Sequence, residues 1–140
     1  MAWPSVEEDV ATALQSASPT VGNYSASGTK TIFTGPPRPA DATNGPPTAA
    51  VFVQQYGGGN VPYLNGGAKS WRTPRVQVTV RSGREDYDGG VAKARAVRAA
   101  LHLASLTGYT FCFADDPTPI GRDAEDCWRW TVNCRLGIKI

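Results

Sequence analysis

The pattern of apolar and polar residues is clearest just past the midpoint of the chain. Three valines alternate there with polar residues, which is the period of a half-buried strand: Val76, Val78 and Val80. The polar stretch 83–90 ends this alternation and offers Asp86 and Asp88 as helix N-caps. After it, apolar residues recur at the helical period and stop before Gly108, a residue typical of helix C-terminal caps. We therefore predict a strand, a polar turn and a helix over residues 91–106.

The predicted helix 91–106 is apolar around more of its circumference than a helix on a small sheet needs. Its inner face carries residues at helical spacing: Val91, Ala94, Val97, Leu101 and Ala104. A second apolar set adjoins that face: Ala92, Ala96, Ala99 and Leu103. We expect this excess to be covered either by the N-terminal helix or by a neighbouring subunit, and the sequence leaves both possibilities open.

The rest of the chain supplies one more helix and several strands. Ser5 and Glu8 have the spacing of a capping box at the start of a helix predicted over residues 5–16. Alternating or β-branched runs predict further strands over residues 29–34, 49–56, 109–115 and 127–140. The last two strands should form an antiparallel hairpin, whereas the strand–helix–strand unit 75–115 suits a parallel crossover.

These elements predict a single α+β domain over residues 1–140, in the order α-β-β-β-α-β-β. In this fold a mixed, mostly antiparallel sheet is flanked by two helices. Two segments are predicted to be loops: five prolines exclude a regular element over residues 35–47, and residues 57–67 are flexible by composition. The proline-rich loop 35–47 is expected to be a surface connector, and the glycine-rich loop 57–67 a mobile hairpin tip. The glycine-rich loop lacks the GxGxxG and GK[ST] patterns of nucleotide-binding loops.

Composition argues against an enzyme or a metalloprotein. The chain has 140 residues, with 14 Lys and Arg against 12 Asp and Glu, so it lacks the basic excess of most free-standing DNA-binding proteins. Its three cysteines show no CxxC spacing and are expected to be reduced. The single histidine, His102, is explained by its place near a helix C-terminus. The acidic residues between 115 and 126 suit turns rather than a calcium loop. We therefore expect no catalytic residue, no cofactor and no metal.

Basic residues gather on one parity of two predicted strands. The first strand places Arg75, Gln77, Thr79 and Arg81 on one side, and the last places Arg129, Arg135 and Lys139 on one side. If both strands belong to one sheet, these residues form a basic stripe without acids. The stripe is either an ordinary solvated face or a surface that meets nucleic acid or an acidic partner.

The sequence shows neither an export signal nor a membrane span. Its first ten residues are acidic and lack an apolar core, and the longest fully apolar run, Ala49 to Val53, is far too short to cross a bilayer. We expect a soluble protein that is made in a cytoplasm and has no membrane partner.

Several motifs, taken in their order, resemble the tail terminator family of long-tailed bacteriophages, whose members are often labelled minor capsid proteins. The similarity covers about residues 49–136. The matching pieces are the pair Tyr56-Gly57, the strand Pro74 to Arg81, the turn Asp86-Tyr87-Asp88, the helix end Ala100-Leu101 and the turn Pro119 to Asp123. Two features depart from the family: Gly89-Gly90 stands where better helix formers are usual, and the proline-rich loop is long.

The resemblance implies a structural subunit of a homo-oligomeric ring, usually a hexamer. Such a ring caps the tail tube protein, stops tube growth and joins the tail to the head–tail connector or stopper protein, while DNA passes transiently and without sequence specificity through its centre. It implies a virion tail or neck location, assembly in the bacterial host cytoplasm, and no catalysis.

Two sets of residues are the candidate sites under this interpretation. The basic stripe would line the lumen or a subunit interface: Arg75, Gln77, Arg81, Arg129 and Arg135. The glycine-rich loop would dock a partner: Gly57, Gly58, Gly59, Asn60, Tyr63, Gly66 and Gly67. The alternatives are another neck or head-completion protein of the virion, or a small nucleic-acid-binding α+β module. The module would need exposed aromatic residues for base stacking, whereas Trp128 and Trp130 share the parity of the buried positions.

Overall fold

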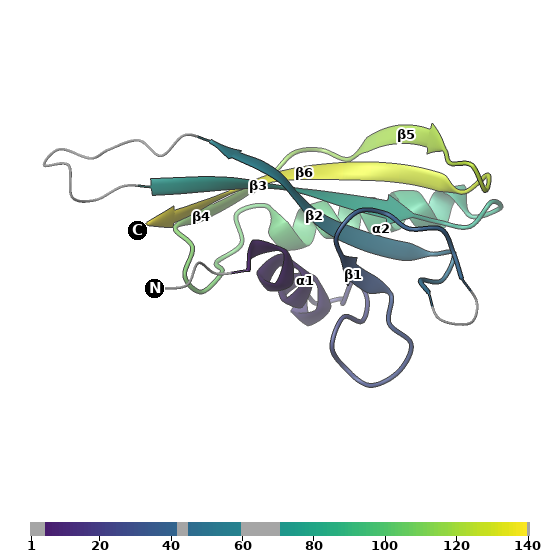
Figure 1. Ribbon diagram of the computed structural model, residues 1–140, viewed down its shortest axis with the longest axis horizontal. Helices are drawn as coiled ribbons and strands as arrows, with labels where there is room; N and C mark the ends of the chain where they lie inside the picture. Colours follow the sequence, from purple (N-terminus) through teal and green to yellow (C-terminus); the bar gives the residue numbers. More distant parts are fainter. Residues whose placement is uncertain (1–4, 42–44, 60–70, 140) are drawn as a thin grey trace, which may run out of the picture.

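A computed structural model of the protein describes residues 5–41, 45–59 and 71–139 (Figure 1). Its elements, in chain order, are α1 (Val6–Ser16), β1 (Ile32–Thr34), β2 (Ala50–Gly59), β3 (Trp71–Arg81), α2 (Tyr87–Leu101), β4 (Phe111–Ala114), β5 (Thr118–Arg122) and β6 (Trp128–Lys139). The predicted α+β class and order of elements are confirmed. The short strand β5 is an addition, lying where the sequence indicated only turns.

The strands form one sheet in the order β1-β2-β3-β6-β4, and β5 also pairs with β6. Strand β4 pairs with the C-terminal half of β6 and β5 with its N-terminal half, so the two lie one after the other along the same edge. This confirms the predicted antiparallel hairpin. Strands β3 and β4 are both antiparallel to β6, which lies between them. They are therefore parallel to each other, as the predicted crossover requires.

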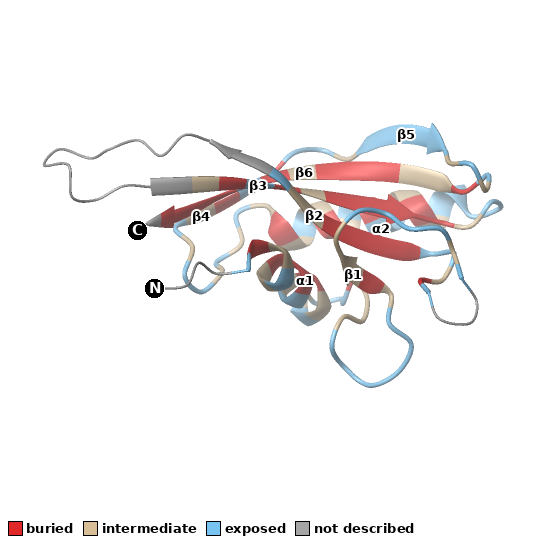
Figure 2. Cartoon of the chain, in the orientation of Figure 1, coloured by how far each residue is buried: buried red, intermediate tan, exposed pale blue. Residues whose placement is uncertain are grey.

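Both helices lie on one face of the sheet, which we call the inner face (Figure 1). The three alternating valines of β3 are buried there, opposite Cys134, Val132 and Trp130 of β6. Helix α2 contributes Gly90, Ala94, Val97 and Leu101 to the same core, and α1 contributes Val6, Val10, Ala11 and Leu14. Buried residues predominate in the central strands β2, β3 and β6, whereas β5 is exposed along its length (Figure 2).

Helix α1 starts without the predicted capping box. Ser5 occupies the N-cap position, but its side chain makes no capping hydrogen bond. The first turn is instead closed by the Asp9 N–H donating to the Ser5 carbonyl. Glu7 has a different use: its carboxylate accepts the Gln55 N–H of β2 at 2.9 Å. Strand β1 pairs with β2 only as far as Val53, so it offers no partner to the Gln55 N–H, and Glu7 supplies one.

Helix α2 begins and ends earlier than predicted. Asp86 is its N-cap, and the Asp86 carboxylate accepts the Gly89 N–H at 3.0 Å, as expected of one of the two candidate caps. The helix stops at Leu101, because Leu103 adopts a left-handed conformation with φ of 61°. Gly108 therefore caps no helix; it lies in a separate turn before β4.

The chain beyond α2 covers the free edge of β4. The Leu103 N–H donates to the Cys112 carbonyl at 2.8 Å, and the Ala114 N–H donates to Nδ1 of His102 at 3.2 Å. His102 thus accepts a hydrogen bond from the strand backbone through Nδ1. An edge strand with satisfied backbone groups is a poor template for unwanted strand pairing.

The apolar excess on α2 is covered only in part. Ala96 and Ala100 pack against the core, and α1 contacts α2. Ala92 and Ala99 are exposed, as is Leu103 just beyond the helix end. Of the two possibilities left open by the sequence, the N-terminal helix accounts for one side, and the outermost residues are uncovered in the single chain.

Gly90 permits the close approach of α2 to β6. A Cβ added at this position would overlap Cζ3 and Cη2 of Trp130 and crowd the Ser82 hydroxyl. Trp130 is buried and its ring lies 5.3 Å from that of Tyr87. The glycine that departs from the usual family pattern is therefore explained by packing: it gives up helix propensity to let the first turn of α2 lie on an indole ring.

We expect Gly90→Ala to lower the free energy of unfolding by about 1–3 kcal/mol, because overpacking outweighs the gain in helix propensity. Gly83→Ala is the matched control, since a Cβ at Gly83 would meet nothing within 4 Å. Urea unfolding of both variants would check this. Equal stability of the two variants would contradict the packing argument.

The three cysteines are free and buried, as predicted for reduced thiols. Burial raises the pKa of Cys112 to about 11 and that of Cys134 to about 12. For Cys134, the nearby Cys112 and Asp115 add to the rise. Because only the thiolate is a strong nucleophile, these side chains act as small apolar residues of the core.

These raised pKa values predict a loss of stability at alkaline pH. The native state holds the thiol protons more tightly than the unfolded state, whose thiols titrate near pH ~8.5. The stabilisation is therefore complete below that pH and declines as pH rises towards 11, the value for Cys112. Urea unfolding between pH 7 and 10.5 would measure the decline. It should be smaller in Cys134→Ala than in the wild type; an identical decline would contradict the assignment.

Candidate functional site

The face of the sheet opposite the helices, here called the outer face, holds the five candidate site residues of the predicted basic stripe. The register pairs Arg75 with Arg135, Gln77 with Asn133, Thr79 with Thr131 and Arg81 with Arg129. Directly opposed residues of an antiparallel pair point to the same side. The sequence therefore placed these residues on one face correctly, but the two ends of that face differ in their surroundings.

Arg81, at one end, is a buried structural residue. It is only 5% exposed, and its guanidinium donates to two backbone carbonyls of the proline-rich loop and to that of the residue just after it. Nε reaches the Thr48 carbonyl and Nη2 the Pro47 carbonyl, each at 2.9 Å, while Nη1 reaches that of Arg38. The guanidinium of Arg81 thus binds the loop and its end. The sequence did not indicate these contacts.

Aromatic rings complete this clamp. The guanidinium of Arg81 lies 5.1 Å from the ring of Phe52, which is fully buried although it belongs to the outer face. Phe33 stacks on Phe52 at 5.7 Å, and Arg38 lies over Phe33 at 5.2 Å. The proline-rich loop therefore covers this end of the outer face, and β2 is buried on both faces there, as its apolar start predicted.

We expect Arg81→Gln to lower the free energy of unfolding by about 2–4 kcal/mol, because buried carbonyls lose charged donors. Arg75→Gln, on the same face of the same strand but exposed, should change it by less than about 0.5 kcal/mol. Urea unfolding would compare them, and limited proteolysis would report on the loop. If the loop of Arg81→Gln resisted cleavage as the wild type does, the clamp would be refuted.

The opposite end of the outer face is open. Arg75 and Arg135 are direct partners across β3 and β6, and both are exposed. Neither forms an ion pair within the described ranges 5–41, 45–59 and 71–139. Like charges directly opposed across strands repel each other. The single chain therefore carries a local concentration of positive charge that no described acidic residue neutralises by an ion pair.

An aromatic residue and two amides border the arginines. Phe113 of β4 lies opposite Arg135, is 38% exposed and stacks on Phe111 at 5.1 Å. Gln77 donates to Asn133 at 3.2 Å. We call these residues the arginine face: Arg75, Gln77, Phe113, Asn133 and Arg135. The sequence missed Phe113, although the alternation of 109–115 placed the aromatic residues together and only their side of the sheet was undecided.

Arg129 lies between these two environments. It is half-buried, and Nη2 donates to the Arg122 carbonyl at 3.4 Å. Its Nε is buried and has no hydrogen-bond partner in the part of the chain that the structure describes. Arg129 is thus neither clamped like Arg81 nor open like Arg75.

Only part of the predicted docking loop can be placed. Gly57, Gly58 and Gly59 belong to β2 and pair with Arg75, Pro74 and Thr73, so the strand is longer than the sequence indicated. Asn60, Tyr63, Gly66 and Gly67 lie outside the described residues. Their role in docking stays a prediction.

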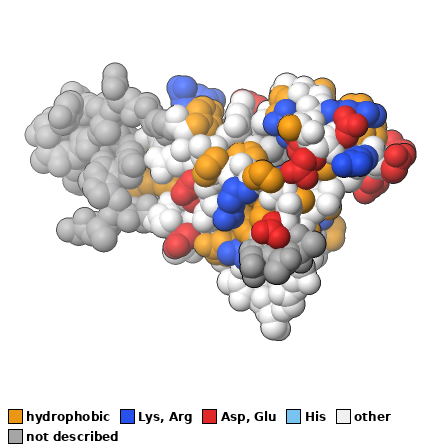
Figure 3. All heavy atoms as spheres, turned by 45° about the vertical axis from the view of Figure 1, so that its right-hand side comes forward, with side chains coloured by type: hydrophobic (Ala, Val, Ile, Leu, Met, Phe, Trp, Pro, Cys, Tyr) orange, Lys and Arg blue, Asp and Glu red, His pale blue; other side chains and the backbone are white. Residues whose placement is uncertain are grey.

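Acidic residues collect in the turns at the clamped end of the sheet, between β3 and α2 and between β5 and β6. Asp123 accepts the N–H groups of Glu125 and Cys127, each at 2.9 Å, which is the turn chemistry expected from the sequence. Glu85 and Asp88 are exposed, and neither forms an ion pair with another described residue. Figure 3 shows acidic and basic side chains intermixed at this end of the molecule.

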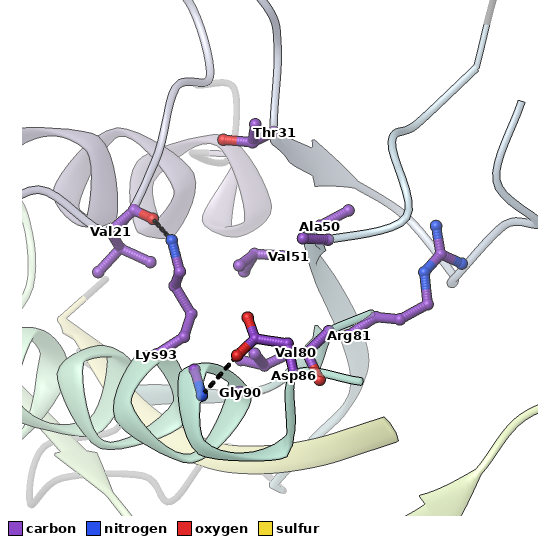
Figure 4. A pocket seen from close by; sticks show the side chains of 12 residues that line it. Val21, Thr31, Ala50, Val51, Val80, Arg81, Asp86, Gly90 and Lys93 are labelled. Carbon is purple, nitrogen blue, oxygen red and sulfur yellow. Dashed lines mark hydrogen bonds between the residues drawn. The ribbon is translucent and has the colours of Figure 1, made fainter. Parts of the chain in front are cut away.

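A small cavity of about 160 Å³ lies between β2, β3 and the start of α2 (Figure 4). Its charged residues are bound to the protein itself. Lys93 donates to the Val21 carbonyl at 2.8 Å, and Asp86 caps α2. Arg81 extends away from the cavity towards the loop (Figure 4). Asp86 and Lys93 at this cavity therefore each have at least one hydrogen-bond partner within the protein.

His102, Cys112 and Cys134 each have a structural place in the fold. The single histidine is bound to a strand backbone, and the thiols of Cys112 and Cys134 are buried and protonated. Across the described residues, no group of His, Cys, Asp and Glu is arranged to hold a metal ion. In the same part of the chain, no helix is long and apolar enough to span a bilayer. What distinguishes the molecule is an open, charged sheet face, which suits a structural subunit.

Comparison with known proteins identifies the class and then the family. The chain belongs to the bacteriophage tail terminator protein family, whose model matches residues 38–140. In fold it is similar to a chain in the solved structure "Virion of native gene transfer agent (GTA) particle", with a TM-score of 0.68. The two are 15% identical, and the alignment covers 97% of this chain and 96% of the other. No curated protein matches the sequence. The protein is thus a structural component of a phage tail or neck.

Proposed function

We propose that the protein is the subunit of a closed ring that ends the tail tube and joins it to the head connector, with DNA passing through the centre. The observation that carries the proposal is family membership over residues 38–140, a range that contains the whole β2–β3–α2–β4–β5–β6 unit. The exposed residues of α2 and the open arginine face support it, because a subunit of an assembly keeps surfaces that a single chain leaves uncovered.

The proposed role is structural and involves no catalysis. A ring subunit needs rigid surfaces, and the sheet provides them: the long strands β3 and β6 pair over most of their length. The exposed arginines would serve contacts within the assembly rather than sequence recognition. Phosphate contacts, if DNA made any during its passage, would carry no sequence information.

A nucleic-acid-binding module is less well supported. The exposed ring on the arginine face, Phe113, stacks on Phe111. Of the two tryptophans considered from the sequence, Trp130 is buried beneath α2. Trp128 lies between the ring of Tyr87, at 5.0 Å, and the guanidinium of Arg122, at 4.3 Å, and its Nε1 donates to the Arg84 carbonyl. Both indoles are therefore engaged by the protein itself.

Deletion of the gene should yield tails of irregular length and heads without tails, because nothing would stop tube growth or join the two parts. Electron microscopy of lysates would measure both. Supplying the wild-type protein should restore uniform, joined tails with a ring of several copies at the end nearest the head. Normal particles without the protein, or a reconstruction with one isolated copy per particle, would overturn the proposal.

A further inference from the structure

Two sets of exposed charges of opposite sign lie towards opposite ends of strand β3. One is the arginine face, where Arg75 and Arg135 are exposed and form no ion pair with another described residue. The other is the pair of carboxylates on Glu85 and Asp88, in the turn after β3 and the first turn of α2, which are also exposed and unpaired among the described residues. The carboxylates of one set could neutralise the arginines of the other.

The two surfaces cannot meet within one chain. Arg75 and Arg81 are six positions apart on β3, which corresponds to about 20 Å of strand, and Glu85 lies further on in the same direction. Side chains reach only a fraction of that distance. The arginine face and the carboxylates can therefore neutralise each other only between two copies.

We propose that Glu85 and Asp88 of one copy bind Arg75 and Arg135 of the next, as the head-to-tail contact of the proposed ring. A carboxylate placed between two arginines accepts charge-assisted hydrogen bonds and relieves their mutual repulsion. Phe113, exposed beside Arg135, supplies an apolar contact at the edge of the pair. Aromatic residues and arginine are the residues enriched at protein interfaces.

Charge also selects the symmetry of the contact. The arginine face would repel a second arginine face, so a two-fold contact of this surface with itself is unfavourable. Two different surfaces that attract each other form a heterologous contact, which generates a ring when the rotation closes. The inference rests on the proposed function, since it assigns the contact by which such a ring would close.

Reciprocal charge reversal tests the contact. One variant combines Arg75→Glu with Arg135→Glu, and the other combines Glu85→Arg with Asp88→Arg. Each should fold, with a melting temperature near that of the wild type, yet fail to form rings on tails when it replaces the wild-type protein. All four changes together restore the original net charge and the attraction, so the quadruple variant should form rings again.

A mixture of the two double variants provides a second control. In a ring where the two variants alternate, half of the contacts join the glutamates at positions 75 and 135 to the arginines at positions 85 and 88. The other half join unchanged Arg75 and Arg135 to unchanged Glu85 and Asp88, so every contact is attractive. A 1:1 mixture should therefore assemble if the ring has an even number of subunits, and the quadruple variant should assemble for any number. Milder variants, Glu85→Gln with Asp88→Asn, should reduce ring occupancy without abolishing it, in case the reversals impair folding.

The outcomes separate this inference from the proposed function. If the wild type forms rings and both double variants form them equally well, the contact is wrong and the ring proposal stands. If variants assemble but eject DNA more slowly or with greater salt sensitivity, the arginines face DNA, and the contact is also wrong. Failure of the quadruple variant to assemble while it remains folded would equally overturn it. If the wild type itself forms no ring, the proposed function fails first.

Discussion

The pairing of β3 with β6 sets the position of everything else in the domain. Its register places the valines of β3 against Val132, Cys134 and Trp130 on the inner face, where the helices pack. The same register places the arginines opposite one another on the outer face. A slip of one residue would exchange the two faces, burying charges and exposing valines. The hydrophobic core therefore holds the opposed arginines in place, against the repulsion between them.

Local periodicity was enough to predict the elements and their faces, because alternation and helical spacing report which side of an element is buried. It could not predict β5, whose sequence combines Pro119 and Gly121 with full exposure and so carries no alternating signal. The end of α2 was also misjudged. Apolar residues continue past Leu101, but the chain leaves the helix to bind the edge of β4, a contact that depends on tertiary structure.

The sequence could predict which residues of the candidate site share a face of the sheet, but not which of them are exposed and which are buried. Parity alone placed Arg75, Arg81 and Arg135 on one side, and the register bears this out. Whether an arginine on that side is exposed depends on the course of a distant loop: the carbonyl of Arg38 that Arg81 holds is 43 positions away in sequence. Periodicity carries no information about such covering segments. Periodicity could not explain Gly90 either. A glycine is needed there because the indole of Trp130, distant in sequence, leaves no room for a Cβ.

The clamp at Arg81 has a consequence for how the family can vary in sequence. Its guanidinium holds the carbonyl of Arg38, where the chain enters the proline-rich loop, and those of Pro47 and Thr48, where the chain leaves it. One side chain thus fastens both ends of the loop, much as a cross-link would. The entropic cost of closing a loop grows only slowly with its length. The segment between the fastened ends is therefore free to lengthen, shorten or change composition during evolution without disturbing β1, β2 or the sheet beneath it.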